Sequence, residues 1–382
     1  MDFQVDRGDL ARCRTVSGTS APLEAGQVRL RVEAFACTSN NITYAILGEA
    51  FGYWAAFPAE PPWGRIPAWG YAEVVASDHD EVTVGTRAFG LVPMSSELVL
   101  TPDRVDPTGF TDIPPYRSEL AGTHNRYRVI APRSGAVSGP GVASGSRVAS
   151  GPGAADDLAA TDREELCMVL HPLFATAFLL EDHLDDNDAF GADVLVVSSA
   201  SSKTSMAIAF QIQRRGARHL VGVTSSDNRE MVEATGLYDH VLTYDEVPEL
   251  PGDAACYLDV AGSVPIRSAV HERFGVGLVK SVMIGATHWQ DRGAGEQDLP
   301  GAVPTLFFAP SQASQRVRDW GVAELEERLA AAWSEFATWS AGWMRFEHRH
   351  GAAAVQDTYL RLLHNGADPR MGSILTLADT AH

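Results

Sequence analysis

The polar segment Ser198–Ser205 has the residue types and the setting of an anion-binding loop. It follows Val194–Val197, a short apolar run rich in β-branched residues that predicts a strand, and precedes Met206–Arg214, which predicts a helix. The next strand is predicted at Leu220–Val223. In such a strand–loop–helix–strand unit, the free N–H groups and the dipole at the helix start favour a bound phosphate. This segment is the strongest indication in the sequence of a nucleotide site.

Four side chains of this loop are the predicted phosphate ligands, namely Ser201, Ser202, Lys203 and Thr204. Lys203 is conspicuous because the chain has only one other lysine, Lys280. The competing interpretation is a cluster of helix N-cap residues, for which serine and threonine are ordinary choices. The loop also lacks the glycines that usually let a diphosphate approach the backbone. A fold that no longer binds nucleotide therefore stays an alternative.

The residues after the predicted second strand indicate which cofactor would be bound. The strand ends at Thr224 and is followed by Ser225-Ser226-Asp227-Asn228-Arg229. An NAD site usually has an acidic residue near this strand end, where it binds the ribose 2′-hydroxyl. Hydroxyl groups followed by an arginine suit a 2′-phosphate, to which a guanidinium donates two parallel hydrogen bonds. We therefore expect NADP(H), with Ser225 and Arg229 as ligands. The alternative is a capped helix start with Arg229 in solvent.

The order of predicted elements divides the chain into a β-rich part and an α/β part. Before residue 130, strands are predicted at Val28–Phe35, Tyr71–Ser77 and Arg87–Val92. A Ser/Gly-rich stretch at residues 134–160 predicts a flexible insertion. Strands and helices then alternate, with strands predicted at Val194–Val197, Leu220–Val223, Val241–Thr243, Ala255–Asp259, Val279–Ile284 and Thr305–Phe308. Helices at Glu324–Phe336 and Ala353–His364 and a strand at Ile374–Leu377 complete the pattern.

Several segments resemble the medium-chain dehydrogenase/reductase superfamily: Ala36–Tyr44, Phe174–Phe178, Tyr257–Gly262, Met283–Ala286, Val355–Leu360 and Met371–Leu375. The resemblance is nearest to the zinc-independent quinone oxidoreductases and enoyl reductases, since the catalytic-zinc cysteine, the Gly-His-Glu motif and the four-cysteine lobe are missing. It implies an α/β fold in which a β-rich GroES-like domain is combined with a Rossmann domain, a doubly wound parallel sheet. The implied boundaries are a GroES-like catalytic domain at residues 1–165, a Rossmann domain at 166–318, and a return to the catalytic domain at 319–382.

The same resemblance implies further cofactor contacts in the Rossmann domain. Thr176 matches a threonine on the nicotinamide side, and Tyr244 matches a position beside the adenosine half. Gly262 and Gly285 fall where the backbone lines the dinucleotide cleft. The alternatives are a surface tyrosine for Tyr244 and tight strand-end geometry for each glycine.

The implied catalytic residues are Asn41, Tyr44 and Tyr53, which lie where the substrate cleft of this family begins. Asn41 would donate an N–H to a carbonyl, and either tyrosine would supply a proton. The alternative is a loop core of aromatic residues. The implied function is NADPH-dependent, metal-independent reduction of an activated C=C bond or a quinone-like carbonyl. The second hypothesis keeps the fold without redox chemistry, as a lyase, an isomerase or a small-molecule-binding protein.

Composition limits the partners. The net charge of −19 argues against a nucleic-acid or anionic-membrane surface, so a small-molecule substrate is expected. The four cysteines form no metal-ligand or disulfide spacing, which favours no metal and a reducing compartment. The absence of an apolar signal core or a long apolar run favours a cytoplasmic protein. The resemblance implies a homodimer joined through the strand at Thr305–Phe308.

Overall fold

The computed structural model describes residues 1–18, 21–118, 120, 122–130, 160–216, 218–260, 262–284, 299–364 and 366–377. Within these ranges the chain forms two compact units. Unit 1 comprises the described residues of 1–130, 160–169 and 344–377, and unit 2 comprises those of 170–343. Residues 134–159 of the predicted insertion lie outside the described residues, and a helix begins at Ala160.

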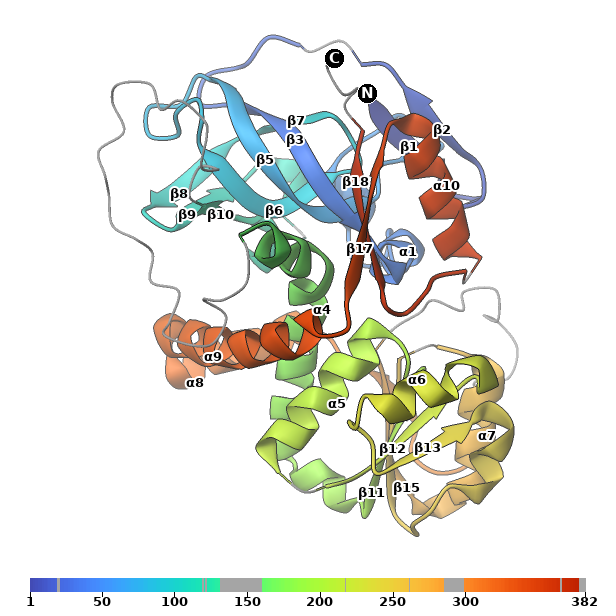
Figure 1. The fold of residues 1–382 in the computed structure, drawn as a ribbon. Coiled ribbons are helices and arrows are strands. Elements are labelled where there is room, and N and C mark those ends of the chain that lie inside the picture. The colour runs from blue at the N-terminus through green and yellow to red at the C-terminus, as the bar shows by residue number, and fades with distance from the viewer. Residues whose placement is uncertain are drawn as a thin grey trace. The chain divides into compact units, whose positions relative to one another are not determined.

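Unit 1 is built mainly of strands, shown in blue, cyan and red in Figure 1. Its strands are β1 (Asp2–Asp6), β2 (Cys13–Val16), β3 (Val28–Cys37), β4 (Trp63–Gly64), β5 (Pro67–Ser77), β6 (Arg87–Pro93), β7 (Glu97–Leu100), β8 (Pro102–Asp106), β9 (Gly109–Asp112), β10 (Arg126–Ile130), β17 (Arg345–His350) and β18 (Met371–Thr376). Its helices are α1 (Ser39–Ile46), α2 (Tyr53–Ala56), α3 (Gly122–Asn125) and α10 (Ala352–Leu363), with a 3-10 turn η1 (Pro115–Arg117).

The predicted strands of unit 1 are confirmed. Along the described chain the larger sheet has the order β17-β18-β3-β5-β6-β10-β9-β8, and β7 also pairs with β3. The strand β18 pairs antiparallel with β3, so the chain after unit 2 returns to the sheet of unit 1. In β3, buried Val28, Leu30 and Val32 alternate with more exposed residues, as expected for a strand with one face on the core.

Unit 2 is a parallel sheet covered by helices. Its strands are β11 (Val194–Ser198), β12 (His219–Thr224), β13 (His240–Thr243), β14 (Ala255–Asp259), β15 (Leu278–Met283) and β16 (Pro304–Leu306). Its helices are α4 (Ala160–Asp186, from residue 170), α5 (Lys203–Arg215), α6 (Arg229–Ala234), α7 (Val264–Phe274), α8 (Ala309–Trp320) and α9 (Val322–Ala341). Short 3-10 turns are η3 (Asp188–Gly191), η4 (Ser226–Asn228), η5 (Tyr244–Glu249) and η6 (Gly275–Gly277).

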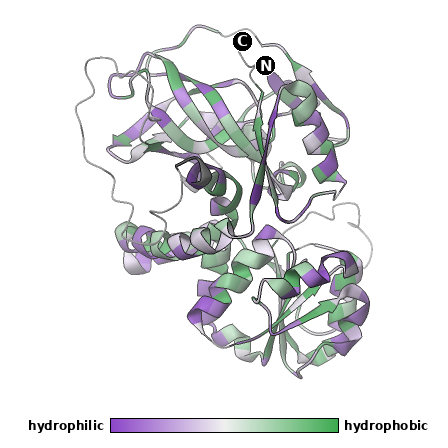
Figure 2. Cartoon of the chain, viewed as in Figure 1, coloured by the Kyte–Doolittle hydropathy of each residue, from purple (hydrophilic) through white to green (hydrophobic). Residues whose placement is uncertain are grey.

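The order of strands in unit 2 defines where a ligand would bind. Among the described residues the order is β13-β12-β11-β14-β15-β16, and every adjacent pair is parallel. The strands are largely hydrophobic in Figure 2, because both faces of the sheet are buried. This is the predicted doubly wound Rossmann arrangement. The strand order reverses between β11 and β14, and dinucleotides bind at the carboxyl ends of strands at such a reversal.

The chain leaves unit 2 later than the sequence predicts. The predicted return to the first domain was at residue 319, but residues 319–343 cluster with unit 2. The reason is that α9 packs on α5: the rings of Phe210 and Phe336 lie 5.2 Å apart, and Arg214 donates to Glu335 at 2.9 Å. These contacts join residues far apart in sequence, which local pattern does not reveal.

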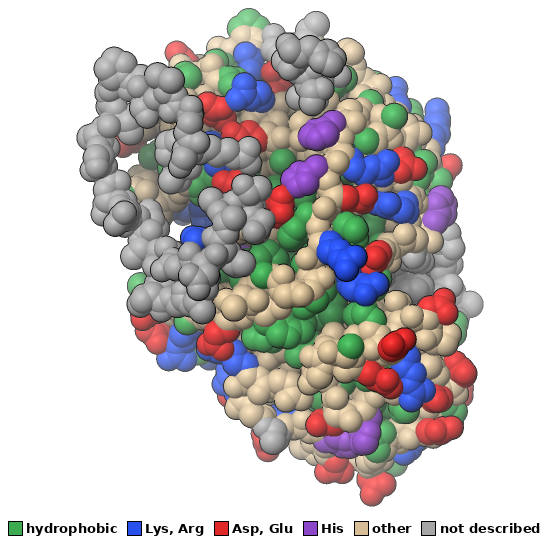
Figure 3. Space-filling view, viewed as in Figure 1, with side chains coloured by type: hydrophobic (Ala, Val, Ile, Leu, Met, Phe, Trp, Pro, Cys, Tyr) green, Lys and Arg blue, Asp and Glu red, His purple; other side chains and the backbone are tan. Residues whose placement is uncertain are grey.

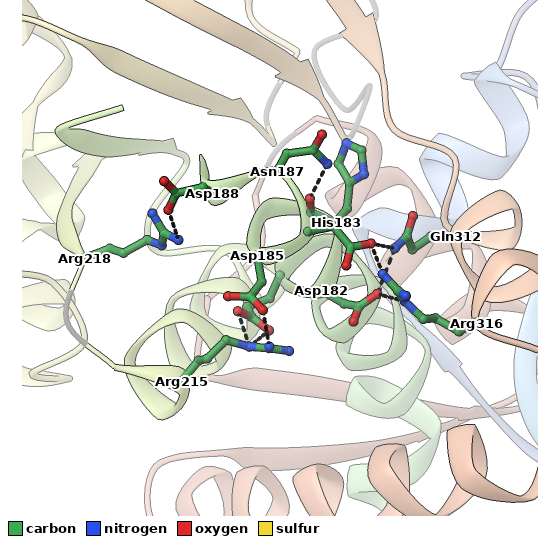
Figure 4. A network of polar contacts seen from close by, with 11 residues as sticks. Asp182, His183, Asp185, Asn187, Asp188, Arg215, Arg218, Gln312 and Arg316 are labelled. Carbon is green, nitrogen blue, oxygen red and sulfur yellow. Dashed lines mark hydrogen bonds and ion pairs between the residues drawn. The ribbon is translucent and has the colours of Figure 1, made fainter. Parts of the chain in front are cut away.

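A buried ionic network fixes α8 against α4 (Figure 4). The guanidinium of Arg316 donates to Asp182 at 2.5 Å, and Gln312 donates to the same carboxylate at 2.8 Å. The side chains of Asp182 and Arg316 are only 5% and 7% exposed. On the other side of α4, Arg215 pairs with Glu181 and Asp185. Burial raises the pKa of Glu181 to about 7 despite the neighbouring Arg215.

Candidate functional site: the loop between β11 and α5, and a tyrosine–histidine cluster

The loop between β11 and α5 adopts a compact turn that ends in a helix cap. The hydroxyl of Ser202 accepts the N–H of Ser205 at 3.1 Å and donates to the hydroxyl of Ser205 at 2.9 Å. Ser205 in turn donates to the carbonyl of Ser198 at 2.9 Å. Ser202 is therefore the N-cap of α5, as the competing interpretation proposed, and its hydroxyl is already engaged.

The loop needs positive φ at one described position, and serine adopts it. Ser199 has φ 52°, whereas Ser202 has an ordinary extended conformation. A non-glycine residue in the left-handed region costs on the order of 1 kcal/mol, which the surrounding contacts must offset. Glycine is required instead on β12, where a Cβ at Gly222 would lie 2.9 Å from the Cβ of Ala200. The close approach of loop and sheet thus depends on Gly222.

The remaining groups of the loop fit a diphosphate. The helix α5 begins at Lys203, so the positive end of its dipole lies at this loop. Lys203 adds a positive charge, and Ser201 adds a hydroxyl. These groups lie at the amino end of a 13-residue helix, beside the reversal in strand order. This donor set suits a dianionic group.

A buried ion pair that sequence reasoning missed organises the other side of the reversal. Asp259, fully buried at the end of β14, accepts Arg267 Nε at 2.8 Å and the hydroxyl of Ser198 at 3.2 Å. It also accepts the N–H of Gly262 at 2.9 Å. Gly262 has φ 69°, a conformation that favours glycine. Asp259 thereby ties the ends of β11 and β14 together. Its position at a strand end in Tyr257–Gly262 was the available signal.

Two other predicted cofactor residues have defined partners, and one lies outside the described chain. Tyr244, at the start of η5, is hydrogen-bonded to Ser199, so its side chain contacts the loop between β11 and α5. Thr176 lies within α4, and its hydroxyl donates to the carbonyl of Pro172 at 3.2 Å. Gly285 is not among the described residues.

Ser225 follows the end of β12 and Arg229 begins α6, where its side chain forms ion pairs instead of facing only solvent. Its Nη1 donates to both carboxylate oxygens of Glu246, at 3.0 and 2.9 Å, and its Nε donates to Glu233 at 3.0 Å. The hydroxyl of Ser225 accepts the side-chain amide of Asn228 at 3.0 Å. The structure thus brings together the loop, Tyr244 and Gly262, and directs Arg229 toward Glu246.

In unit 1 the side chain of Asn41 is buried and hydrogen-bonded to the backbone at both ends of its amide. Asn41 is 3% exposed, and its Oδ1 accepts the N–H of Thr38 at 2.7 Å in a capping box at the start of α1. Its Nδ2 donates to the carbonyl of Pro67 at 2.8 Å. Oxygen and nitrogen are both bonded to backbone, so the expected donation to a substrate carbonyl has no support in this geometry.

The rings of Tyr44 and Tyr53 are in contact, and the ring of His124 packs near both. The rings of Tyr44 and Tyr53 are 4.4 Å apart, and that of His124 lies 5.5 Å from Tyr53 and 6.2 Å from Tyr44. Trp69 donates its Nε1–H to the hydroxyl of Tyr44 at 3.0 Å. We name Tyr44, Tyr53, Trp69 and His124 the tyrosine–histidine cluster. The two tyrosines predicted to be catalytic are therefore also part of an aromatic core, which was the alternative interpretation.

Two polar groups of this cluster lack partners among the described residues. The Nδ1 of His124 is buried without a hydrogen bond, and no hydrogen bond to the hydroxyl of Tyr53 is present. Burial, with the charge of Arg117 acting in the same direction, lowers the pKa of His124 to about 4. Burial and the neighbouring Tyr44 raise the pKa of Tyr53. At neutral pH both side chains are uncharged.

In the described ranges, no three His, Cys, Asp or Glu side chains gather closely enough to hold a metal ion. No helix there has the length and apolar character needed to cross a bilayer. On the face in Figure 3, acidic and basic side chains are interspersed rather than gathered in one basic patch.

Comparison with known proteins assigns the family. Residues 35–368 match the family described as Protein of unknown function (DUF2855), and because the match covers most of the chain, the chain belongs to this family. No curated protein matches.

Solved structures define the fold more closely. CurA from Vibrio vulnificus in complex with NADPH superposes with a TM-score of 0.60 at 12% identity, over 99% of each chain. YhdH from E. coli K-12 with bound NADPH gives a TM-score of 0.53 at 13% identity, over 99% of this chain and 100% of its own. The CurF ER cyclopropanase from the curacin A pathway gives 0.53 at 14% identity, over 96% of each chain. The chain therefore has the medium-chain dehydrogenase/reductase fold, with a GroES-like and a Rossmann part, as the resemblance implied.

Proposed function

We propose that the protein is an NADPH-dependent, metal-independent oxidoreductase that reduces an activated C=C bond or a quinone-like carbonyl of a small molecule. The observation that carries the proposal is the Ser201–Thr204 loop, which presents hydroxyls, a lysine and a helix start where the parallel strand order reverses. Two proteins of the same fold, CurA and YhdH, have been solved with NADPH bound, which supports the choice of cofactor.

The proposed ligands lie in unit 2. Ser201, Lys203 and Thr204 would hold the diphosphate, while Tyr244 would lie beside the adenosine half. Ser225 and Arg229 would bind the 2′-phosphate. When bound, NADPH supplies a hydride, and the protein supplies orientation and exclusion of water.

The tyrosine–histidine cluster of unit 1 offers the groups that such a reduction also needs. Hydride addition to an activated C=C bond or a carbonyl leaves negative charge that must be stabilised and then protonated. The hydroxyl of Tyr53 carries a proton at neutral pH and has no partner among the described residues. The neutral imidazole of His124 packs against the ring of Tyr53, and in the proposed reaction it would help to orient this tyrosine.

A second function is favoured by one observation. The loop between β11 and α5 has no glycine, and the hydroxyl of its Ser202 is engaged in capping α5. A loop whose donors serve only the helix would belong to a protein of this fold without redox activity, such as a lyase, an isomerase or a small-molecule-binding protein.

Binding of dinucleotides separates the two functions. NADPH at a hundredfold excess over its dissociation constant should stabilise the fold by about 2.7 kcal/mol, seen as a rise in melting temperature. Arg229→Ala should weaken NADPH binding far more than NADH binding in a calorimetric titration. Equal losses for both would refute the 2′-phosphate assignment. No thermal shift with either dinucleotide, for well-folded protein, would favour the second function.

A further inference from the structure

Arg229 is occupied by a carboxylate that reaches it from the next strand end. It begins α6 after β12, whereas Glu246 belongs to η5 after β13, and these strands are neighbours. Both carboxylate oxygens of Glu246 accept hydrogen bonds from Nη1 of Arg229, at 3.0 and 2.9 Å. The side chains of Arg229 and Glu246 are 39% and 31% exposed, so a ligand in solution can reach both.

Glu246 is held in place independently of Arg229. Its Oε2 accepts the N–H of Thr243 at 2.8 Å, which completes a capping box at the start of η5. This backbone hydrogen bond, followed by the contact with Arg229, lowers the pKa of Glu246. The carboxylate is therefore ionised at neutral pH and fixed beside the guanidinium.

From this geometry we infer that Glu246 is a specificity-determining residue that limits the affinity for 2′-phosphorylated nucleotides by competing for Arg229. The inference rests on the proposed nucleotide site. A phosphate that binds a guanidinium through two N–H groups uses Nη2 together with Nη1 or Nε. Glu246 accepts from Nη1 and Glu233 accepts from Nε. A 2′-phosphate that binds through Nη1 and Nη2 must therefore displace Glu246, and the displaced negative charge then stays near the phosphate. NADH carries no 2′-phosphate, so Glu246 leaves its binding unaffected.

The test removes the charge of Glu246 while keeping the cap. Glutamine at this position of a capping box still accepts a backbone N–H. We expect Glu246→Gln to tighten NADPH binding about three- to tenfold in a calorimetric titration at low salt, with NADH binding unchanged within twofold. Adenosine 2′,5′-bisphosphate and 5′-AMP, used as separate probes, should show the same contrast.

Glu249→Gln is the matched control. Glu249 lies in the same 3-10 turn, is exposed, and forms no ion pair among the described residues. Its loss removes the same charge without touching Arg229, so NADPH binding should change less than twofold. An equal gain in NADPH affinity in both variants would mean that the effect comes from the lower net negative charge of the protein, and it would overturn the inference.

A double variant shows whether the effect passes through Arg229. In an Arg229→Ala background, Glu246→Gln should give no gain in NADPH affinity. If Glu246→Gln unfolds the protein, Glu246→Asp is the substitute variant. Its shorter side chain moves the carboxylate away from Arg229, so NADPH binding should also become tighter. NADPH binding that is unchanged or weaker in Glu246→Gln overturns the inference alone. No nucleotide binding by any variant overturns both the inference and the proposed function.

Discussion

At the scale of single residues, Tyr53 is distinguished from Tyr44 by its hydrogen bonds. The hydroxyl of Tyr44 accepts the indole N–H of Trp69, whereas that of Tyr53 meets no partner among the described residues. Both rings are buried, and burial raises the pKa of each. Both hydroxyls keep their proton at neutral pH, but only that of Tyr44 is already fixed by a hydrogen bond from Trp69. In the proposed reaction, Tyr53 would therefore be the proton donor and Tyr44 would support its ring.

Replacing Tyr53 should affect turnover more than stability. Tyr53→Phe keeps the ring contacts but removes the proton, so kcat should fall about 100-fold or more if the hydroxyl is the general acid. Steady-state kinetics with NADPH and a quinone or an enone would measure this. Tyr44→Phe is the control, with a smaller loss expected. Because the pKa of His124 is about 4, the imidazole is neutral from pH 5 to 8 and should add no step to the kcat profile there. A wild-type kcat retained by Tyr53→Phe would contradict the proposed role.

At the scale of elements, ionic contacts decide how helices are attached to unit 2. Arg316 of α8 points toward α4 and meets Asp182, as Figure 4 shows. The same guanidinium donates to Asp319 at 3.0 Å, within its own helix. Because Asp182 is 3% exposed, its charge depends on Arg316 and Gln312 rather than on water. The attachment of α8 is therefore sensitive to the loss of one partner.

Removing the cation should destabilise unit 2. Arg316→Met keeps most of the side-chain volume but leaves Asp182 buried without a counter-charge, which should lower the free energy of unfolding by about 3–5 kcal/mol. Urea unfolding followed by tryptophan fluorescence would measure the change. Arg328→Met is the matched control, since its ion pair with Glu324 is exposed and worth about 0–1 kcal/mol. Similar losses in both variants would argue against the buried network.

At the scale of the whole molecule, the β16 edge of the parallel sheet exposes apolar side chains. Among the described residues β16 is the last strand in the order, and this strand and its flanks expose Leu306 by 46%, Val303 by 78% and Phe308 by 36%. An edge strand with exposed apolar side chains favours pairing with another chain. The predicted homodimer through this strand, which the family resemblance implied, stays a prediction that this surface supports.

Light scattering during size exclusion would test the dimer. The expected mass is about 82 kDa, twice the 41.0 kDa of the chain. Leu306→Arg should shift the protein to the monomer mass, because a cation at the edge strand opposes sheet extension. Val322→Arg, at an exposed apolar residue of α9, should leave the mass unchanged. A wild-type monomer at micromolar concentration would contradict the prediction.

What the sequence determined by itself is local in origin. The strands and helices, the polar loop between β11 and α5, and the capping alternative for Ser202 follow from residue patterns within short windows, and the family segments supplied the two-part fold. Tertiary structure alone decided which distant groups meet. It paired Arg229 with Glu246, joined Asp259 to Arg267 at the strand reversal, and brought His124 to Tyr53. It also bonded both ends of the Asn41 amide to backbone and kept α9 with unit 2. Such pairings depend on strand order and packing, which side-chain periodicity does not encode.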